Sequence, residues 1–260
     1  MKARSFGRYL FFTVAAAASL LMFTWPLFIS SIAQSEAQLA QLAFLFLMPT
    51  ILILAVNEYS SGSIDSRQLA LLGVLSALNA LIRMLGAGAA GIETAFFLII
   101  ISAYVFGSGF GFLMGAISLL VSGLITGGIG PWLPFQMMAA ALIGAGAGLL
   151  PKLKRSWLEV LQLIFYGAIA SFVFGALMTI WNWPFLAGVG SDVSYLAGAG
   201  LIENLTRFLQ YEILTGGLLW DTGRAITTMI LIAVTAPALL TTLRRAANRA
   251  GIKIAELEKR

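Results

Sequence analysis

Charged side chains that could bind a polar ligand stand at the ends of long apolar segments of this sequence. These segments hold no charge near their centres and are bordered by Arg83, Glu93, Asp221 and Arg224. Ionisable groups at the rim of an apolar helix bundle could line a binding cavity that opens to water. The same groups could instead only anchor helix ends by extending toward the membrane surface. We predict a ligand-binding rim, and the residues alone leave the second interpretation open.

The stretch ITGGIGPWLPFQ, residues 125–136, interrupts an uncharged region with a turn. Its three glycines permit backbone angles that other residues avoid, while its two prolines fix their own φ angles. The turn is therefore predicted to be tight and rigid, and to hold Trp132 and Gln136 still. An aromatic plate beside an amide suits capture of a flat, hydrogen-bonding ligand, although Trp is also a common anchor at a membrane interface.

Several kinds of chemistry are excluded because the sequence has no histidine and no cysteine. Disulfides, thiol nucleophiles, imidazole bases and the usual ligands of zinc or haem are absent with them. Neither a phosphate-binding G-x-x-x-x-G-K-[ST] motif nor a G-x-S-x-G nucleophile motif occurs. We expect no metal, no cofactor and no enzymatic activity, and any ATP-driven work must come from another chain.

The elements that position these residues are membrane-spanning helices. Hydrophobic residues make up 60% of the chain and charged residues 10%, whereas about 25% of the residues in a soluble domain are charged. Since a membrane helix needs about 20 apolar residues, we predict an all-α membrane protein. Eight spans are expected, at residues 9–30, 37–56, 68–85, 94–107, 109–127, 134–150, 157–181 and 223–243. The first resembles a signal peptide, but its apolar run is too long for one, so we keep it as a span.

The distribution of basic residues predicts the orientation of the chain. Cytoplasmic loops hold Lys and Arg in excess. Two cytoplasmic termini place 13 of the 16 Lys and Arg residues inside and leave Arg83, Arg207 and Arg224 outside. Topology and anionic lipid account for the net charge of +5, so we expect no nucleic-acid partner. The predicted location is the plasma membrane.

The chain is predicted to have three parts. Residues 1–66 form a two-helix N-terminal extension, 67–247 a six-helix substrate-binding core, and 248–260 a basic cytoplasmic tail. The hydrophilic stretch NEYSSGSIDSRQ, residues 57–68, separates the first two parts. We expect the long connection after the fifth core span to lie outside the cell.

This connection contains the amphipathic stretch LIENLTRFLQYEIL, residues 201–214. One helical face carries Leu201, Leu205, Phe208 and Leu209, and Glu203 and Arg207 are spaced i,i+4. We predict a helix at the outer membrane surface, which could act as a lid or lie there passively.

Small residues recur at helical spacing in three places. One series is Gly107, Gly111 and Gly115, and another is Gly144 and Gly148. Such spacing lets helix backbones approach closely in lipid, and most cases serve packing within one chain. The third series lies on the first core helix and could face a partner subunit. It comprises Ala70, Gly73, Ala77 and Ala80.

Taken together, these features resemble the substrate-binding S component of energy-coupling factor (ECF) transporters. The resemblance covers about residues 67–247 and is carried by the stretches GAGAAGIETAFFLI, GGIGPWLPFQM, NWPF and WDTGRAI, which are similar to those of an eight-span, actinobacterial-type group. It implies a subunit that captures a vitamin or similar micronutrient outside the cell. It also implies docking on an EcfT-type transmembrane coupling subunit that two ATPases drive.

The resemblance further implies where partner and substrate bind. The docking motif of the family, Ala-x-x-x-Ala on the first core helix, corresponds here to Gly73-x-x-x-Ala77 or to the overlapping Ser76-x-x-x-Ala80. We therefore expect docking at Ala70, Gly73, Ser76, Ala77 and Ala80. Ligands of the family sit in the outer half of the core. Substrate contacts are expected at Arg83, Glu93, Trp132, Gln136, Asn182, Trp183, Asn204, Arg207, Asp221 and Arg224.

Only the residue types at the predicted ligand-binding rim indicate which substrate is bound. Charges of both signs beside Trp and amide groups suit a large neutral molecule with many amides, so cobalamin is the first candidate, and riboflavin or another vitamin is an alternative. Two other functions compete. An intramembrane enzyme acting on a lipid or isoprenoid could use Glu93, Glu203 or Asp221, but the sequence has no Asp-x-x-Asp motif. A secondary transporter working alone is disfavoured because no charge lies at mid-membrane.

Overall fold

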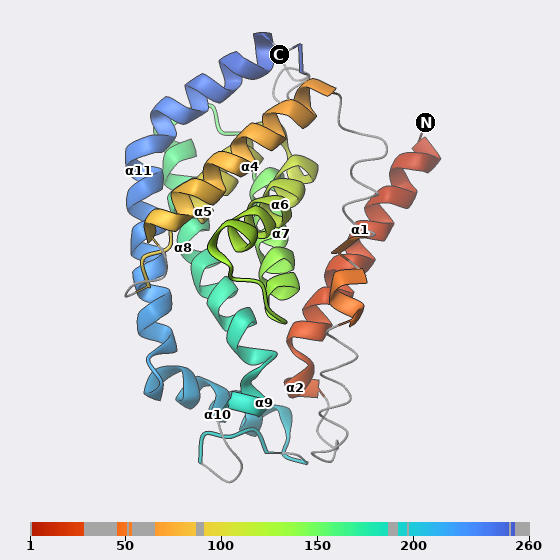
Figure 1. Ribbon diagram of the computed structural model, residues 1–260, viewed down its shortest axis with the longest axis vertical. Coiled ribbons are helices and arrows are strands. Elements are labelled where there is room, and N and C mark those ends of the chain that lie inside the picture. Colours follow the sequence, from red (N-terminus) through yellow and green to blue (C-terminus); the bar gives the residue numbers. More distant parts are fainter. Residues whose placement is uncertain are drawn as a thin grey trace. The chain divides into compact units, whose positions relative to one another are not determined.

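Helices form every regular element of the residues that the structure describes. The computed structural model describes residues 2–28, 46–50, 52–53, 66–86, 91–186, 192–196, 198–249 and 251–252. Its labelled helices (Figure 1) are α1 (Lys2–Phe23), α2 (Trp25–Phe28), α4 (Ser66–Gly86), α5 (Phe96–Phe106), α6 (Ser108–Thr126), α7 (Leu133–Leu149), α8 (Ser156–Ile180), α9 (Trp183–Leu186), α10 (Leu201–Leu214) and α11 (Gly217–Arg249).

The six predicted core spans are all present as helices. Helices α4, α6, α8 and α11 are long and apolar enough to cross a membrane, and α5 and α7 are shorter apolar helices. The prediction of an all-α membrane protein is confirmed. Of the two spans predicted before the core, the first is represented by α1, which ends at Phe23 ahead of Pro26. The second lies mostly outside the described residues, which include helical segments at 46–50 and 52–53.

Helix α5 is the shortest core helix, and protein encloses it. All of its residues except Phe106 are buried. At 1.5 Å per residue it is about 16 Å long, well short of the roughly 30 Å hydrocarbon layer. A helix surrounded by other helices need not match the lipid thickness, which explains how so short an element can stand in the core.

Helix α11 begins at Gly217, earlier than the predicted start at Gly223. Asp221 and Arg224 therefore lie inside the helix and not at its edge. The prediction followed the apolar run, which stops at these charges. The helix continues through them because the two side chains are three residues apart and form an ion pair.

The chain forms two compact units. One consists of residues 1–58 and 175–219, and the other of residues 59–174 and 220–260. We call the first the extension unit and the second the core unit, and we describe each separately. Helices α8 and α11 each contribute to both units.

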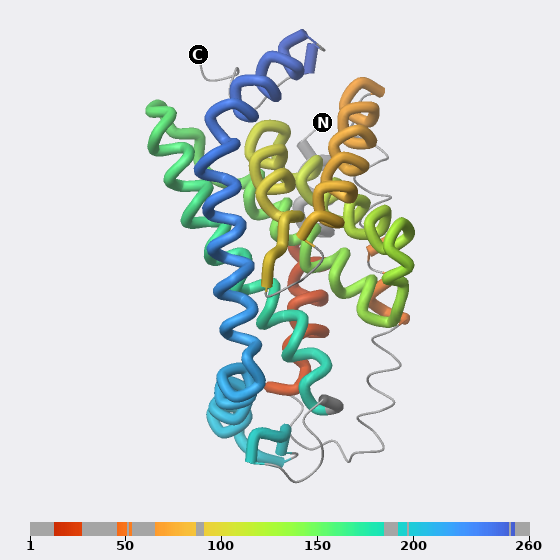
Figure 2. The backbone as a smooth tube through the Cα atoms, turned by 60° about the vertical axis from the view of Figure 1, so that its left-hand side comes forward, coloured from red at the N-terminus to blue at the C-terminus, as the bar shows by residue number. Residues whose placement is uncertain are grey.

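Within the core unit, the glycine series on α6 and α7 pack against each other. The two helices run side by side (Figures 1 and 2). A Cβ atom at Gly111 would lie 2.3 Å from the carbonyl oxygen of Gly144, and one at Gly115 would lie 2.2 Å from that of Ala140. Side chains at these positions would force the backbones apart. These two series therefore serve packing within the chain, as small residues do in most membrane helices.

The connection between α5 and α6 is a single residue. Only Gly107 separates the two helices, with a φ of 97° that residues with a side chain rarely adopt. Its amide donates to the carbonyl oxygen of Ala103 at 2.8 Å, which closes the end of α5. The chain therefore reverses at one glycine and continues directly into α6.

Within the extension unit, aromatic residues join α2 to the connection that follows α8. The indole nitrogen of Trp25 donates to the carbonyl oxygen of Trp181 at 2.9 Å. The ring centre of Tyr195 lies 6.3 Å from that of Trp25 and 5.8 Å from that of Trp183. Trp183 also packs edge-on against Phe208 of α10. The N-terminal residues are therefore part of the unit that carries α10.

Replacement of Trp25 by phenylalanine should destabilise the extension unit modestly. Trp25 is 2% exposed, so the change removes one buried hydrogen bond and leaves the Trp181 carbonyl without that donor. We expect a loss of about 1 kcal/mol in the free energy of unfolding. Chemical denaturation in detergent would measure it. Trp157→Phe is the matched control, because Trp157 is 59% exposed and should show no loss. Equal stability of the two variants would contradict the prediction.

Helix α10 forms where the amphipathic pattern predicts a helix. Its buried face is polar, however, and consists of Asn204, Phe208 and Glu212. Leu201, Leu205 and Leu209, which with Phe208 make the predicted apolar face, are 47%, 40% and 53% exposed, respectively. An exposed row of leucines is the arrangement expected of a helix that rests on a membrane surface.

Candidate functional site

The first ion pair of the core unit joins the end of α4 to the segment before α5. The Nε atom of Arg83 lies 3.5 Å from Oε1 of Glu93, and Nη1 of Arg83 donates to the Ser122 hydroxyl of α6 at 3.0 Å. Oε1 of Glu93 also accepts a hydrogen bond from the backbone N–H of Ala95 at 3.2 Å. The side chains of Arg83 and Glu93 are 23% and 14% exposed. They are therefore largely withdrawn from the surface.

The second ion pair lies within α11. Arg224 and Asp221 are three residues apart and contact each other directly, and their side chains are 10% and 9% exposed. Nη1 of Arg224 also donates to the carbonyl oxygen of Ser171 at 3.4 Å, and its guanidinium carbon lies 5.2 Å from the ring centre of Phe174. The stacked aromatic face and the carboxylate together compensate the buried cation.

A close backbone contact brings the two pairs to one end of the core unit. A Cβ atom at Gly91 would lie 2.4 Å from the carbonyl oxygen of Trp220 and 3.3 Å from the Cα atom of Gly223. Gly91 has a φ of 78° and precedes Glu93 by two residues. The segment that carries Glu93 thus packs on the turns of α11 that carry Asp221 and Arg224. We call this the ion-pair end of the core unit.

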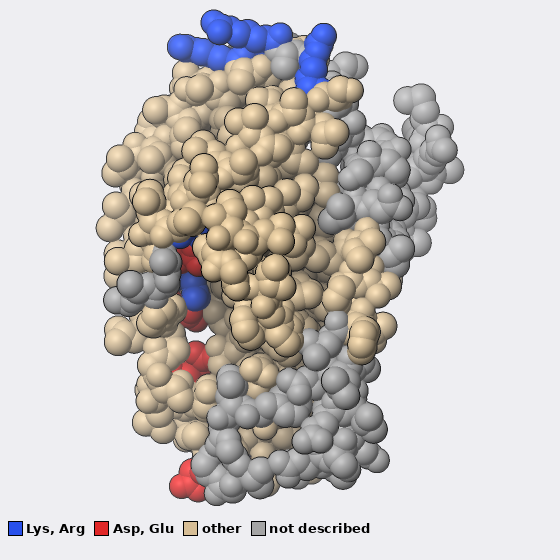
Figure 3. Space-filling model, in the orientation of Figure 1, with Lys and Arg blue, Asp and Glu red and all other residues tan. Residues whose placement is uncertain are grey.

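The surface of the molecule agrees with this arrangement. Over the core unit, Figure 3 shows acidic and basic atoms set back below the surrounding uncharged atoms, while basic residues gather at the end where α4 begins and α11 ends. The positions of Arg67 and Gly251 mark that opposite end, because a Cβ atom at Gly251 would lie 3.1 Å from Nη1 of Arg67. We call it the basic end.

The glycine and proline turn places its two predicted site residues differently. Helix α6 ends at Gly127, which adopts a left-handed φ of 67°, and α7 begins at Leu133. Trp132 is 47% exposed, and its ring folds over Gly130, where a Cβ atom would approach it to 2.5 Å. Gln136 lies in the first turn of α7 and is half-buried. The turn is as tight as predicted, and among the described residues no hydrogen bond or ion pair joins Trp132 or Gln136 to the ion pairs.

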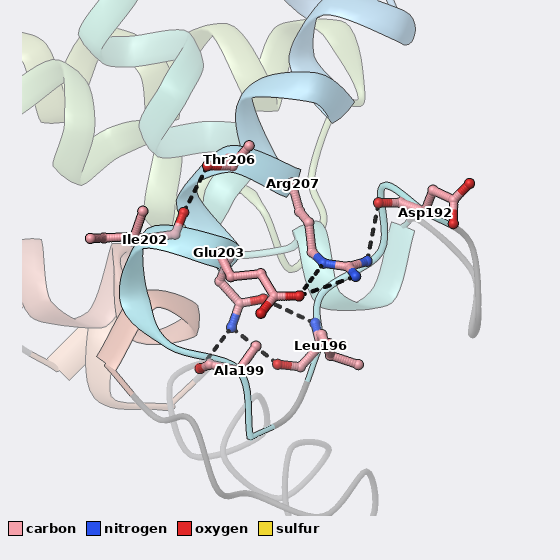
Figure 4. Close-up of polar contacts among 8 residues, drawn as sticks. Asp192, Leu196, Ala199, Ile202, Glu203, Thr206 and Arg207 are labelled. Carbon is pink, nitrogen blue, oxygen red and sulfur yellow. Dashed lines mark hydrogen bonds and ion pairs between the residues drawn. The ribbon is translucent and has the colours of Figure 1, made fainter.

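The predicted residues of the extension unit mostly hold its own backbone. The Asn204 amide accepts from the Leu196 N–H at 3.0 Å and donates to the Leu196 carbonyl at 3.1 Å. Arg207 contacts Oε1 of Glu203 at 3.3 Å and the Asp192 carbonyl at 3.1 Å (Figure 4).

Asn182 and Trp183, which follow α8, are the other predicted site residues of the extension unit. Trp183 is fully buried, and its indole nitrogen donates to Val193 at 3.0 Å. Asn182 is half-buried. Trp183 and Asn204 therefore position the connection between α9 and α10, and the geometry lends no support to a direct substrate contact by either.

Sequence reasoning missed a buried carboxylate at the basic end. Glu159 is 4% exposed and accepts hydrogen bonds from Arg244 at 2.8 and 3.2 Å and from the Tyr104 hydroxyl at 3.0 Å. The Lys152 ammonium lies 3.5 Å from the ring centre of Tyr104. This cluster joins α5, α8 and α11. The sequence held a signal, since Glu159 is an acidic residue that follows the basic residue Arg155 by four positions, at the start of an apolar run.

The predicted docking residues divide between two faces of α4. Ala70, Gly73 and Ala77 are exposed, and a Cβ atom at Gly73 would meet nothing within 4 Å. In contrast, Ser76 and Ala80 are 1% and 0% exposed. At 100° per residue, the two overlapping motifs point in different directions. Only the Gly73 motif faces outward from the core unit.

A helical, apolar bundle that withdraws ion pairs from its surface defines a multi-pass membrane protein with a polar site at one end. Comparison with protein families then identifies its kind. The family model described as "ECF transporter, substrate-specific component" matches residues 67–247, and the chain belongs to this family. Its members are transporter subunits that bind small molecules and associate with EcfT and ATPases. Searches of curated proteins and of solved structures find no match.

Proposed function

We propose that this protein captures a vitamin or similar micronutrient outside the cell and delivers it by docking on a transmembrane coupling subunit driven by two ATPases. Family membership supports the general role of a substrate-binding subunit. The observation that carries the proposed site is the location of two ion pairs at the same end of the core unit. Charges of both signs, held close to neutrality, suit a polar but uncharged ligand.

The orientation is part of the proposal. The basic end holds the start of α4, the end of α11 and the connection with Lys152, Lys154 and Arg155. Basic residues of this kind favour the cytoplasmic side. The ion-pair end would then face outward, where a capture subunit must bind its substrate.

The substrate is proposed from the chemistry of this end. A large neutral molecule with several amide groups could form hydrogen bonds with the charged groups of both ion pairs without adding net charge. Cobalamin is the first candidate and riboflavin the second. The contacts are proposed at Arg83, Glu93, Asp221 and Arg224, with Trp132 and Gln136 at the exposed turn.

Docking is proposed on the outward face of α4. The exposed positions Ala70, Gly73 and Ala77 leave room for a partner helix to approach closely. The buried positions Ser76 and Ala80 are unsuited to that contact.

The proposal predicts ligand binding without ATP. The purified chain, titrated with cyanocobalamin and with riboflavin, should bind one of them with a Kd on the order of nanomolar to micromolar. Vesicles should take up that vitamin only when the coupling subunit and ATPases are coexpressed. Uptake at the full rate by the chain alone would contradict the proposal. The proposal would also be contradicted if neither vitamin binds and mass spectrometry finds no co-purified small molecule.

A further inference from the structure

The inward face of α4 carries polar side chains from the ion-pair end toward the middle of the helix. Ser76, Asn79 and Arg83 follow each other at spacings of three and four residues, so they share one face. From Ser76 to Arg83 the rise is about 10 Å. Because Arg83 donates to Ser122 of α6, this face is directed at α6, the helix against which α4 makes most of its contacts.

The polar atoms along this face are buried without hydrogen-bond partners. Asn79 is 0% exposed, and within the described part of the chain neither its Oδ1 nor its Nδ2 atom has a partner. The same holds for Oγ of Ser76, which is 1% exposed. The Nε atom of Arg83 also makes no hydrogen bond there, although it lies in the ion pair with Glu93. The unpartnered groups thus continue inward from a residue of the proposed site.

Such an arrangement is costly unless another molecule completes it. A buried amide without a hydrogen bond is among the expensive features of a protein interior, and the membrane offers no water to compensate. A leucine of similar size would pack in the same place without this cost. The burial of Asn79 without hydrogen-bond partners among the described residues therefore favours a role in binding over a role in packing.

We propose that Asn79 and Ser76 form an inner subsite that receives an uncharged group bearing a hydrogen-bond donor and an acceptor side by side, such as a carboxamide or a cyclic imide. The Asn79 carboxamide offers the complementary acceptor and donor, and the Ser76 hydroxyl offers either. This inference rests on the proposed function and names the substrate chemistry that its inner end recognises. A ligand group seated there would contact the same helix whose outward face carries Gly73 and Ala77.

The test compares Asn79→Leu with the wild-type chain in detergent. Isothermal titration with cyanocobalamin and riboflavin and mass spectrometry of co-purified small molecules would report binding, and thermal unfolding would report stability. We expect the Kd of the vitamin that binds the wild type to rise about 10- to 100-fold, because two hydrogen bonds are lost. The melting temperature should stay the same or rise, since an unpartnered amide is removed.

Gln162→Leu is the matched control. Gln162 of α8 also has a buried, unpartnered amide oxygen within the described residues, but it lies one turn from Glu159 at the basic end. Its replacement should leave the Kd unchanged. An unchanged Kd in Asn79→Leu would overturn the subsite while leaving the proposed function intact. An equal loss of affinity in both variants would overturn it too, and a wild-type chain that binds nothing would overturn the proposed function itself.

Discussion

Replacement of Asp221 by alanine is expected to lower the free energy of unfolding by about 3 kcal/mol or more and to abolish vitamin binding. The change leaves the guanidinium of Arg224 buried without its carboxylate, and the side chains of the pair are 10% and 9% exposed. An unpaired charge that is buried in this way loses hydration without electrostatic compensation. Denaturant titration in detergent would measure the loss of stability, and calorimetric titration the loss of binding.

A double variant separates the two effects. Asp221→Leu combined with Arg224→Met removes both charges, and replacing a buried ion pair by apolar side chains is often neutral for stability. We expect stability near that of the wild type but no recovery of binding. The exposed pair of Glu203 and Arg207 provides the comparison, because Glu203 is 51% exposed and Glu203→Ala should cost less than about 1 kcal/mol. Recovery of binding in the double variant would show that the pair is only structural.

Replacement of Ala77 by tryptophan is expected to prevent assembly with the coupling subunit while vitamin binding stays unchanged. Ala77 lies on the exposed face of α4, four residues from Gly73. At Gly73, a Cβ atom would have no other atom within 4 Å. A bulky ring there would hold a partner helix away, because close helix contact in lipid depends on small residues. Co-purification of the coupling subunit and uptake into vesicles would measure the effect, and both should fall to background.

Leu78→Trp is the matched control on the same helix. Leu78 is 45% exposed and lies 100° around the helix from Ala77. The added ring should therefore be tolerated, with assembly retained. Assembly that survives Ala77→Trp, or that is lost equally in both variants, would remove the docking assignment at Gly73 and Ala77.

The buried positions of α4 show why spacing alone left the docking register open. Gly73-x-x-x-Ala77 and Ser76-x-x-x-Ala80 have the same spacing and similar residue sizes. The sequence of a helix states which residues share a face, but not which face the neighbouring helices cover. Packing against α6 buries Ser76 and Ala80, and only that contact distinguishes the two motifs.

The structure also separates the predicted site residues into those that it brings together and those that it does not. Arg83, Glu93, Asp221 and Arg224 were predicted from charges that border apolar runs, and the structure does join them in pairs at one end of the core unit. Asn204 was expected as a substrate contact because of the family resemblance, yet its amide forms hydrogen bonds with the backbone of residues 196–199. The sequence does not distinguish a polar side chain of α10 that binds a ligand from one that holds the preceding loop.

The sequence by itself determined that this chain is a helical membrane protein, because apolar runs of sufficient length can satisfy their backbone groups in lipid only as helices. It also predicted where the six core helices lie, since that depends on residues close in the chain. The tertiary structure decided which polar groups meet, which stay unpartnered and which face of α4 is outward. Those outcomes depend on contacts between helices distant in sequence, where a rotation of one helix by a single residue turns its surface by about 100° and so changes which side chains are buried.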